Sequence, residues 1–178
     1  VGSDDNTVYG IDISDGSEQW EYETAFTPVQ SGIAISNETA LIGTNYGSVE
    51  AIDITDGSKE WECAIGSNVK AGIAIANGTA VVGSDDNTVY GIDISDGSEE
   101  WSFSTGGPVE GGVAIDSSGT AVVVSNDDNV YGIDITAGSQ QWSTSDINLL
   151  FNISGAGIAV SNGTAVLGTG EGDIYGVN

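Results

Sequence analysis

Four tryptophans recur along this chain at the nearly constant intervals of 41, 40 and 41 residues. An aspartate and a glycine precede each of them at the same spacing. The recurring residues are Trp20, Trp61, Trp101 and Trp142, with Asp12, Asp53, Asp93 and Asp134 and with Gly16, Gly57, Gly97 and Gly138. A fixed period near 40 residues indicates repeats that each form one supersecondary unit. Residues 1–18 and 82–99 are identical, and their offset of 81 residues is two repeats.

Each repeat has the pattern of four short β-strands. In residues 72–103, the apolar segments GIAIA and TAVVGS flank Asn77–Gly78, a dipeptide that favours a two-residue hairpin turn. TVYGID and EEWSFST follow, separated by SDGS, and the last of these alternates apolar with polar residues. Four antiparallel strands in about 40 residues are typical of one β-propeller blade. A β-solenoid is the alternative, but its coils are usually shorter.

The repeats divide a single propeller domain, residues 1–178, into blades. We expect about four blades, arranged either as an arc cut from a larger ring or as an arc whose ends meet another chain. The expected units are a partial blade at 1–31, blades at 32–71, 72–111 and 112–156, and a partial blade at 157–178.

The third turn of each blade carries an eleven-residue motif. It reads GIDISDGSEQW at 10–20, and it recurs at 51–61, 91–101 and 132–142 with a small residue at place one, Asp at three, Gly at seven and Trp at eleven. This resembles the tryptophan-docking motif of the PQQ-like (quinoprotein-type) β-propeller repeat family, over nearly the whole chain. Place six departs from the family, because it holds Asp or Ala137 instead of the usual Thr.

The resemblance implies that each indole stacks on places one and two of the next blade's motif. Trp20 is then expected on Ala51, Trp61 on Gly91, Trp101 on Gly132 and Trp142 on Gly176. Gly10 would be left without a tryptophan. Propellers of the family commonly have about eight blades, which favours an arc of a larger ring.

The charge of the chain limits its partners and its setting. The chain has 27 acidic residues but only two lysines and no arginine or histidine, so its formal net charge is −25. Such a chain repels itself in dilute salt, whereas molar salt shortens the Debye length to about 3 Å. The composition therefore predicts a halophilic, haloarchaeal origin. Two lysines cannot neutralise phosphates, so nucleic acid and anionic membrane surfaces are excluded as partners. The chain has no run of 18 apolar residues, so membrane insertion through a helix is not expected.

Catalysis is not expected. PQQ-dependent dehydrogenases of the resembled family hold their quinone with basic side chains, calcium and a vicinal disulfide, whereas this chain offers Lys59, Lys70 and one cysteine. Its carboxylates recur in every blade, which favours a structural role, because a catalytic pair should occur once. No cofactor is expected. The turns SDDN at 3–6 and 84–87 and NDDN at 126–129 leave calcium as a weak alternative to solvated turns.

Two groups of residues are candidates for binding. Between Trp142 and the next blade the connection is longer than elsewhere and carries Leu149, Leu150 and Phe151 in a row, which favours a partner surface. The alternative is local packing. Gln30, Lys70 and Glu110 lie two residues before the opening glycine of three blades. They are candidates for a channel mouth, where Lys70 and Glu110 could pair.

These observations predict a non-enzymatic β-propeller that binds proteins or acts as a scaffold, extracellular or at the cell surface of a halophile. One alternative is a fragment of a PQQ-dependent dehydrogenase whose catalytic residues lie elsewhere. Another is a structural unit that self-associates through open blade edges, because unpaired strand edges readily pair.

Overall fold

The computed structural model describes residues 1–24, 28–144, 157–168 and 174–177, and the described residues form antiparallel β-sheets. Three sheets have four strands in sequential order, one has three strands and one has two. The strands are β1 (Thr7–Ile11) and β2 (Glu18–Glu23); β3 (Ala34–Ser36), β4 (Thr39–Gly43), β5 (Ser48–Asp53) and β6 (Lys59–Ala64); β7 (Ile73–Ala76), β8 (Thr79–Gly83), β9 (Thr88–Asp93) and β10 (Glu99–Ser104); β11 (Val113–Ile115), β12 (Thr120–Val124), β13 (Val130–Asp134) and β14 (Gln140–Thr144); β15 (Ile158–Ser161), β16 (Thr164–Gly168) and β17 (Ile174–Val177).

Left-handed backbone conformations at consecutive asparagine and glycine residues close the first hairpin of two blades. Asn77 and Gly78 have φ angles of 52° and 88°, and Asn162 and Gly163 have φ angles of 52° and 78°. Two consecutive positive φ angles define the turn that matches the twist of a two-residue hairpin. The Asn-Gly dipeptide therefore fixes the pairing of β7 with β8 and of β15 with β16.

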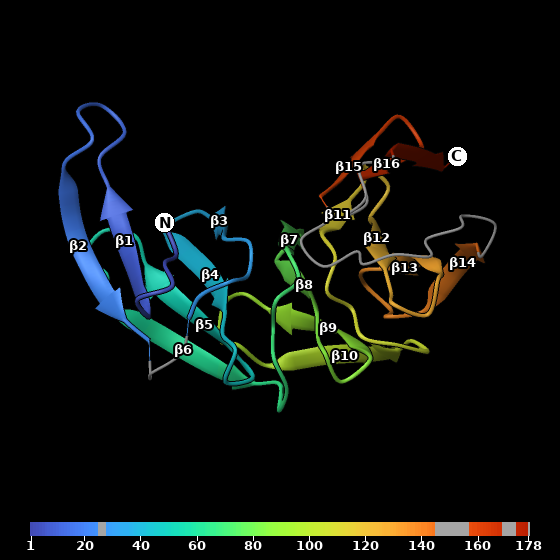
Figure 1. Ribbon diagram of the computed structural model, residues 1–178, viewed down its shortest axis with the longest axis horizontal. Helices are drawn as coiled ribbons and strands as arrows, with labels where there is room; N and C mark the ends of the chain where they lie inside the picture. Colours follow the sequence, from blue (N-terminus) through green and yellow to red (C-terminus); the bar gives the residue numbers. More distant parts are fainter. Residues whose placement is uncertain (25–27, 145–156, 169–173, 178) are drawn as a thin grey trace.

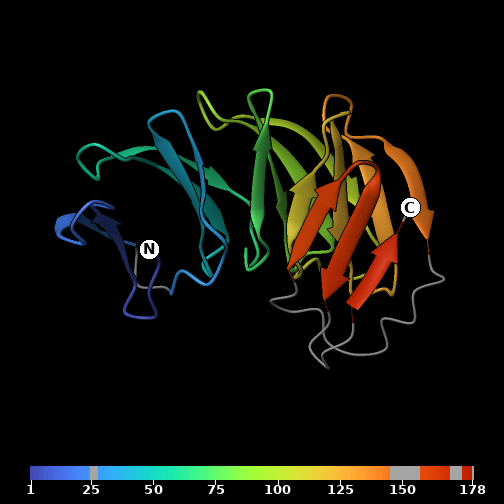
Figure 2. The same cartoon turned by 90° about the horizontal axis from the view of Figure 1, so that it is seen from above.

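The sheets stand side by side as blades of an open arc (Figure 1). The first strands of neighbouring blades are in contact, β3 with β7, β7 with β11 and β11 with β15. These strands lie on the inner side of the arc, and β2, β6, β10 and β14 lie on the outer side (Figures 1 and 2). The prediction of an all-β propeller arc with four-stranded antiparallel blades is confirmed.

The core lies between the blades. Leu41 and Val49 of one blade pack against Ala80 and Ile92 of the next, and all four are fully buried. The same arrangement recurs at the following two interfaces. Burial of apolar area between consecutive sheets is the main force that stacks them. In the described residues, no helix is long and apolar enough to cross a membrane.

Candidate functional site: tryptophan seats and a polar rim

Two aspartates shape the turn between the third and fourth strands of a blade. In the second motif, Asp53 Oδ1 accepts a 2.6 Å hydrogen bond from the Thr55 N–H, and Asp56 Oδ1 accepts a 2.9 Å bond from the Ser58 N–H. Bonds from Ser58 lower the pKa of Asp56. Gly57 completes the turn with a φ of 76°, a conformation that costs glycine little. The carboxylates at these places therefore hold their own turns.

The turn holds the tryptophan of the preceding blade. The Trp20 indole N–H donates a 2.7 Å hydrogen bond to the Ile54 carbonyl oxygen. The indole also lies against Gly57, where an added Cβ would stand 2.8 Å from the ring. We call this combination, the carbonyl at place four and the glycine at place seven, a tryptophan seat. The other seats are Ile94 with Gly97, which holds Trp61, and Ile135 with Gly138, which holds Trp101.

The expectation that each indole stacks on places one and two of the next motif is wrong. Place one lies opposite the tryptophan of its own blade, as in the Gly10–Trp20 pair of the β1–β2 ladder. A Cβ on Gly10 would stand 2.2 Å from the Trp20 ring. The small residue therefore makes room for the ring of its own blade, and Gly10 does not lack a tryptophan.

The correction holds at each interface. The indoles of Trp20, Trp61 and Trp101 bond to place four of the next motif and lie against its place-seven glycine, not on Ala51, Gly91 and Gly132 as expected. The atoms nearest to a Cβ added at Gly91 or Gly132 belong to the tryptophan of the same blade. Trp142 does not stack on Gly176, where an added Cβ would meet no atom within 4 Å. The physical reason is register, since antiparallel pairing places residues one and eleven of a motif side by side.

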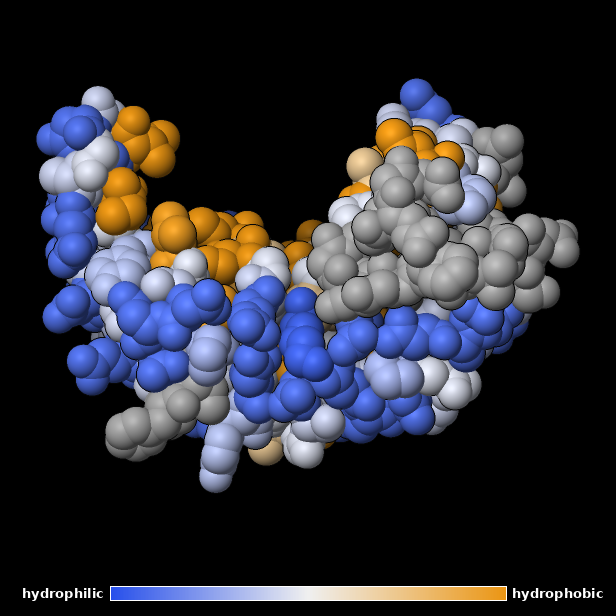
Figure 3. Space-filling model, in the orientation of Figure 1, coloured by the Kyte–Doolittle hydropathy of each residue, from blue (hydrophilic) through white to orange (hydrophobic). Residues whose placement is uncertain are grey.

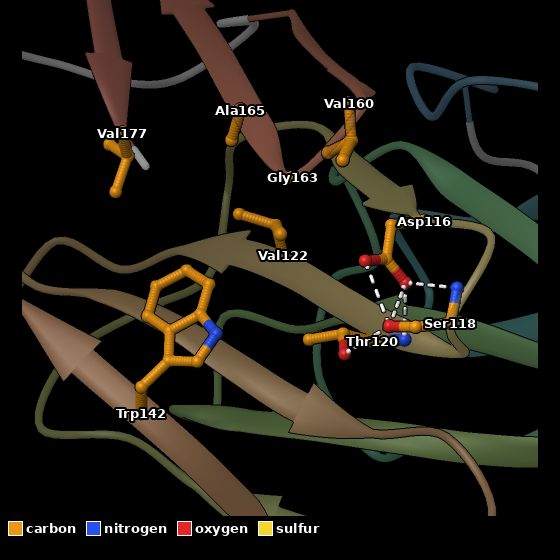
Figure 4. A pocket seen from close by; sticks show the side chains of 9 residues that line it. All are labelled: Asp116, Ser118, Thr120, Val122, Trp142, Val160, Gly163, Ala165 and Val177. Atoms are coloured by element: carbon orange, nitrogen blue, oxygen red, sulfur yellow. Dashed lines mark hydrogen bonds between the residues drawn. The ribbon is translucent and has the colours of Figure 1, made fainter.

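Trp142 lies beside a pocket between the last two sheets. The pocket has a volume of about 330 Å³, and its wall includes Val122, Gly163, Ala165 and Val177 (Figure 4). Among the described residues, no hydrogen bond acceptor faces the Trp142 indole N–H.

The opposite end of the arc exposes an apolar surface. Ile13 is fully exposed and Ile35 is 61% exposed. With Ile11 and Ile33 they line a groove of about 400 Å³. Apolar side chains gather at this end on the inner side of the arc (Figure 3). The seat formed by Ile13 and Gly16 holds no indole, since nothing lies within 4 Å of a Cβ added to Gly16.

A group of four bonded polar side chains, which we call the polar rim, joins three blades. Its members are Lys70, Asp85, Glu110 and Asn126. The Lys70 Nζ lies 2.7 Å from Asp85 Oδ2 and 3.1 Å from Glu110 Oε1. Bonds to Asp85 and then Glu110 raise the pKa of Lys70. Asn126 adds a 2.8 Å hydrogen bond to Glu110 Oε2. The sequence-based pairing of Lys70 with Glu110 omits Asp85, which supplies the shorter contact.

Gln30, the third candidate for the channel mouth, has a separate partner. Its Oε1 accepts a 3.0 Å hydrogen bond from Asn45 Nδ2. Gln30, Lys70 and Glu110 thus occupy equivalent places in three blades, each bonded to the turn between the second and third strands. Their assignment to a channel mouth stays a prediction.

The acidic turns considered for calcium use their carboxylates internally. Asp5, Asp86 and Asp127 each accept a hydrogen bond from a tyrosine hydroxyl four residues on, at 2.9, 2.7 and 2.6 Å. In the part of the chain that the structure describes, no three acidic, histidine or cysteine side chains gather closely enough to hold a metal ion.

The sequence did not indicate that a carboxylate would be buried at the first blade interface. Glu50 is 3% exposed, and its Oε2 accepts a 2.7 Å hydrogen bond from the Tyr22 hydroxyl. Burial and this bond raise the pKa of Tyr22 well above its ordinary value. At the third interface, Phe103 and Tyr131 take the equivalent places and form an edge-to-face pair with ring centroids 5.5 Å apart. The sequence signal that could have revealed this contact is that both positions change together from one interface to another, from Tyr22 and Glu50 to Phe103 and Tyr131.

The predicted partner surface of Leu149, Leu150 and Phe151 lies outside the described residues. Its role stays a prediction.

Blades of four antiparallel strands joined by tryptophan seats define a β-propeller built of PQQ-like repeats. The family model described as outer membrane protein assembly factor BamB matches residues 1–71 and 48–178, and the chain belongs to this family. A comparison with curated proteins gives no match.

Solved structures share the fold. BamB from Moraxella catarrhalis is 24% identical with a TM-score of 0.82, and the match covers 98% of this chain and 53% of that one. The computationally designed Ika8 protein is 21% identical with a TM-score of 0.83, over 98% and 53%. The designed Ika4 protein is 19% identical with a TM-score of 0.76, over 91% and 98%. The chain therefore spans about half the length of BamB and Ika8.

Proposed function

We propose that this chain is a non-enzymatic scaffold that binds another protein, at the cell surface or outside the cell of a halophile. The observation that carries the proposal is the threefold recurrence of the tryptophan seat, with indole-to-carbonyl distances of 2.7, 3.1 and 2.7 Å. At each of these interfaces, the recurring positions of the motif, its tryptophan and its glycine at place seven, hold one blade against the next. The result is a curved body that presents its connecting loops, and membership in a family named for an assembly factor supports the same role.

The acidic surface supports the halophilic setting. The turn carboxylates at Asp15, Asp56 and Asp96 are exposed, and each accepts a hydrogen bond from a backbone N–H within its own turn. Their charges repel those of neighbouring turns in dilute salt, because the Debye length increases as the salt concentration falls. In molar KCl this repulsion is screened. We expect the near-UV circular dichroism of the chain to be lost as KCl is dialysed away and recovered when it is restored.

The partner surface is assigned to the connection that carries Leu149, Leu150 and Phe151. Three apolar residues in succession on a connection between blades would bury against a partner and supply the apolar part of an interface. Proteins captured from a haloarchaeal envelope extract in molar KCl should bind the chain, and replacing all three residues with serine should abolish that capture.

The matched control is Tyr46→Ser, which removes an exposed aromatic side chain, 78% accessible, from a different turn. This variant should capture the same proteins as the unchanged chain. Equal capture by the triple serine variant, with unchanged circular dichroism, would reject the surface. Turnover of an alcohol or aldose with added PQQ, calcium and an electron-accepting dye would reject the non-enzymatic assignment.

A further inference from the structure

Three hairpins between the first and second strands of a sheet carry the tripeptide Asn-x-Thr. It reads NET at 37–39, NGT at 77–79 and NGT at 162–164. These segments join β3 to β4, β7 to β8 and β15 to β16. A related tripeptide, NIS at 152–154, lies outside the described residues. Asparagine followed two residues later by threonine or serine is the sequence that accepts N-linked sugar in exported proteins, provided that the middle residue is not proline.

The asparagine side chains of the three hairpins are available to solvent. Asn37, Asn77 and Asn162 are exposed, and none of their side chains forms a hydrogen bond within the described part of the chain. Their φ angles are 54°, 52° and 52°, in the left-handed region that asparagine tolerates. A sugar linked to Nδ2 would therefore displace no hydrogen bond of the protein.

Two of these hairpins are held in place by the motif turn of the same blade. The Glu38 carbonyl oxygen accepts a 2.8 Å hydrogen bond from the Ile54 N–H, and the Gly78 carbonyl oxygen accepts a 3.0 Å bond from the Ile94 N–H. These bonds use the backbone of the middle residue of the tripeptide and leave the asparagine side chain free. A bulky group on that side chain would thus stand on a fixed turn, and the packing between blades would not change.

Turn geometry alone does not account for the tripeptide. Asn6 and Asn87 also have a positive φ, 70° in both cases, yet neither has threonine or serine two residues later. In the hairpin of Asn37 the middle residue is Glu38 and not the glycine that an Asn-Gly turn prefers, while Thr39 is still present. The combination of asparagine with threonine therefore belongs to the first hairpins and not to left-handed asparagine in general.

The threonine of the tripeptide is engaged once the blade has folded. Thr39 Oγ1 donates a 2.8 Å hydrogen bond to Glu60 Oε2, and Thr79 Oγ1 donates a 2.7 Å bond to Glu100 Oε2. Thr79 is also buried, with 7% exposure. An enzyme that reads the threonine together with the asparagine therefore has to act before the strands of the blade pair.

We propose that Asn37, Asn77 and Asn162 accept N-linked oligosaccharide while the chain is exported. The donor is an oligosaccharide carried on a membrane lipid phosphate. The asparagine Nδ2 bonds to C1 of the sugar, the bond between C1 and the phosphate oxygen breaks, and the lipid phosphate leaves with that electron pair. One Nδ2 proton passes to a base of the transferase. The inference rests on the proposed location outside the cell, because this modification accompanies export.

The three asparagines lie on one side of the arc. Strands of a blade alternate in direction, so the turns after the first strands all point the same way (Figure 2). Thr144 and Ile158, the strand ends that flank the proposed partner connection, lie at the opposite ends of β14 and β15. The sugars would therefore cover the side that carries the motif turns and leave the other side open to a partner.

Mass spectrometry of the chain exported by a haloarchaeal host tests the proposal. An export signal of that host is fused to the chain, so the result does not depend on where the native protein resides. We expect sugar on Asn37, Asn77 and Asn162. Asn87 is the internal control, because it is exposed and has a positive φ but lacks the threonine. The same chain made in the cytoplasm of a bacterium should have the mass of its sequence.

Substitutions at two hairpins sharpen the test. Thr79→Val keeps the β-branched shape but removes the hydroxyl, so it should abolish the sugar on Asn77, whereas Thr79→Ser should retain it. Ser118→Asn introduces the tripeptide into the hairpin DSSGT at 116–120, which lacks it, and should add one sugar. Ser118 is exposed, so this change should leave the circular dichroism in molar KCl unaltered.

Three results would overturn the proposal. They are an exported chain without sugar on any of the three asparagines, equal modification of Asn87, and sugar retained on Asn77 in Thr79→Val. Capture of proteins is measured with the chain made in bacteria, which carries no sugar. Failure of the capture experiment would therefore reject the scaffold role and leave the mass measurement unaffected.

Discussion

The Trp101 indole N–H donates a 2.7 Å hydrogen bond to the carbonyl oxygen of Ile135, 34 residues further along the chain and in the next blade. Trp101 is 9% exposed and Ile135 is 2% exposed. Among the tryptophan seats of the described chain, this one has the most deeply buried tryptophan and the most deeply buried isoleucine. Each described tryptophan seat therefore adds one indole hydrogen bond to the apolar area buried between two blades.

Truncation of this tryptophan should be costly. Trp101→Ala removes the indole bond and leaves a cavity against Gly138, so we expect a loss of about 3–5 kcal/mol in the free energy of unfolding. Because guanidinium chloride is itself a salt, it would change charge screening and unfold the chain at the same time. The loss of stability should therefore be measured by urea unfolding in molar KCl. Trp142→Ala is the control, because its indole N–H has no acceptor among the described residues. An equal loss for both variants in the monomer would contradict the role of the seat.

The seat glycines should be more sensitive than the hairpin glycines. Gly97 and Gly78 both have positive φ angles, 77° and 88°. An added Cβ would stand 2.5 Å from the Trp61 ring at Gly97 but would meet nothing within 4 Å at Gly78. Gly78→Ala should cost about 1 kcal/mol through backbone strain alone. Gly97→Ala should cost about 1–3 kcal/mol more through overpacking. Urea titrations of the two variants measure the difference.

Acid should weaken the turns of the motif. Bonds from Ser58 and Ser98 lower the pKa values of Asp56 and Asp96 below the ordinary 3.8. A pKa lowered by folding contributes stability above the unfolded value, and this contribution is lost as the pH falls through the folded value. The free energy of unfolding should therefore fall below about pH 4. The double variant Asp56→Asn, Asp96→Asn should show a shallower fall, and an unchanged slope would count against these bonds.

The Tyr22–Glu50 contact should be replaceable by an aromatic pair. Tyr22→Phe leaves the buried Glu50 carboxylate without the hydroxyl that donates to it at 2.7 Å, which should cost about 1–3 kcal/mol. Adding Glu50→Tyr recreates the pair that Phe103 and Tyr131 form. We expect the double variant to recover most of the loss in urea unfolding. If the double variant is less stable than Tyr22→Phe alone, the two interfaces are not equivalent.

The sequence predicted the blades because their determinants are local. Alternating apolar residues and the Asn77–Gly78 turn specify which segments pair as β7 and β8. The prediction of the tryptophan partner failed because the motif alone does not reveal which of its backbone groups faces the preceding blade. Place one proved to lie opposite the tryptophan of its own strand pair, as Gly132 lies opposite Trp142.

By itself, the sequence determined the repeat length, the strands and the turns, because hydrogen bonds within a blade join segments that are close along the chain. Tertiary structure decided which carbonyl oxygen receives each indole and that Lys70 meets Asp85 as well as Glu110. It also decided that Glu50 would be buried against Tyr22. These contacts cross between sheets, so they depend on how the twist and stacking of whole blades bring side chains together.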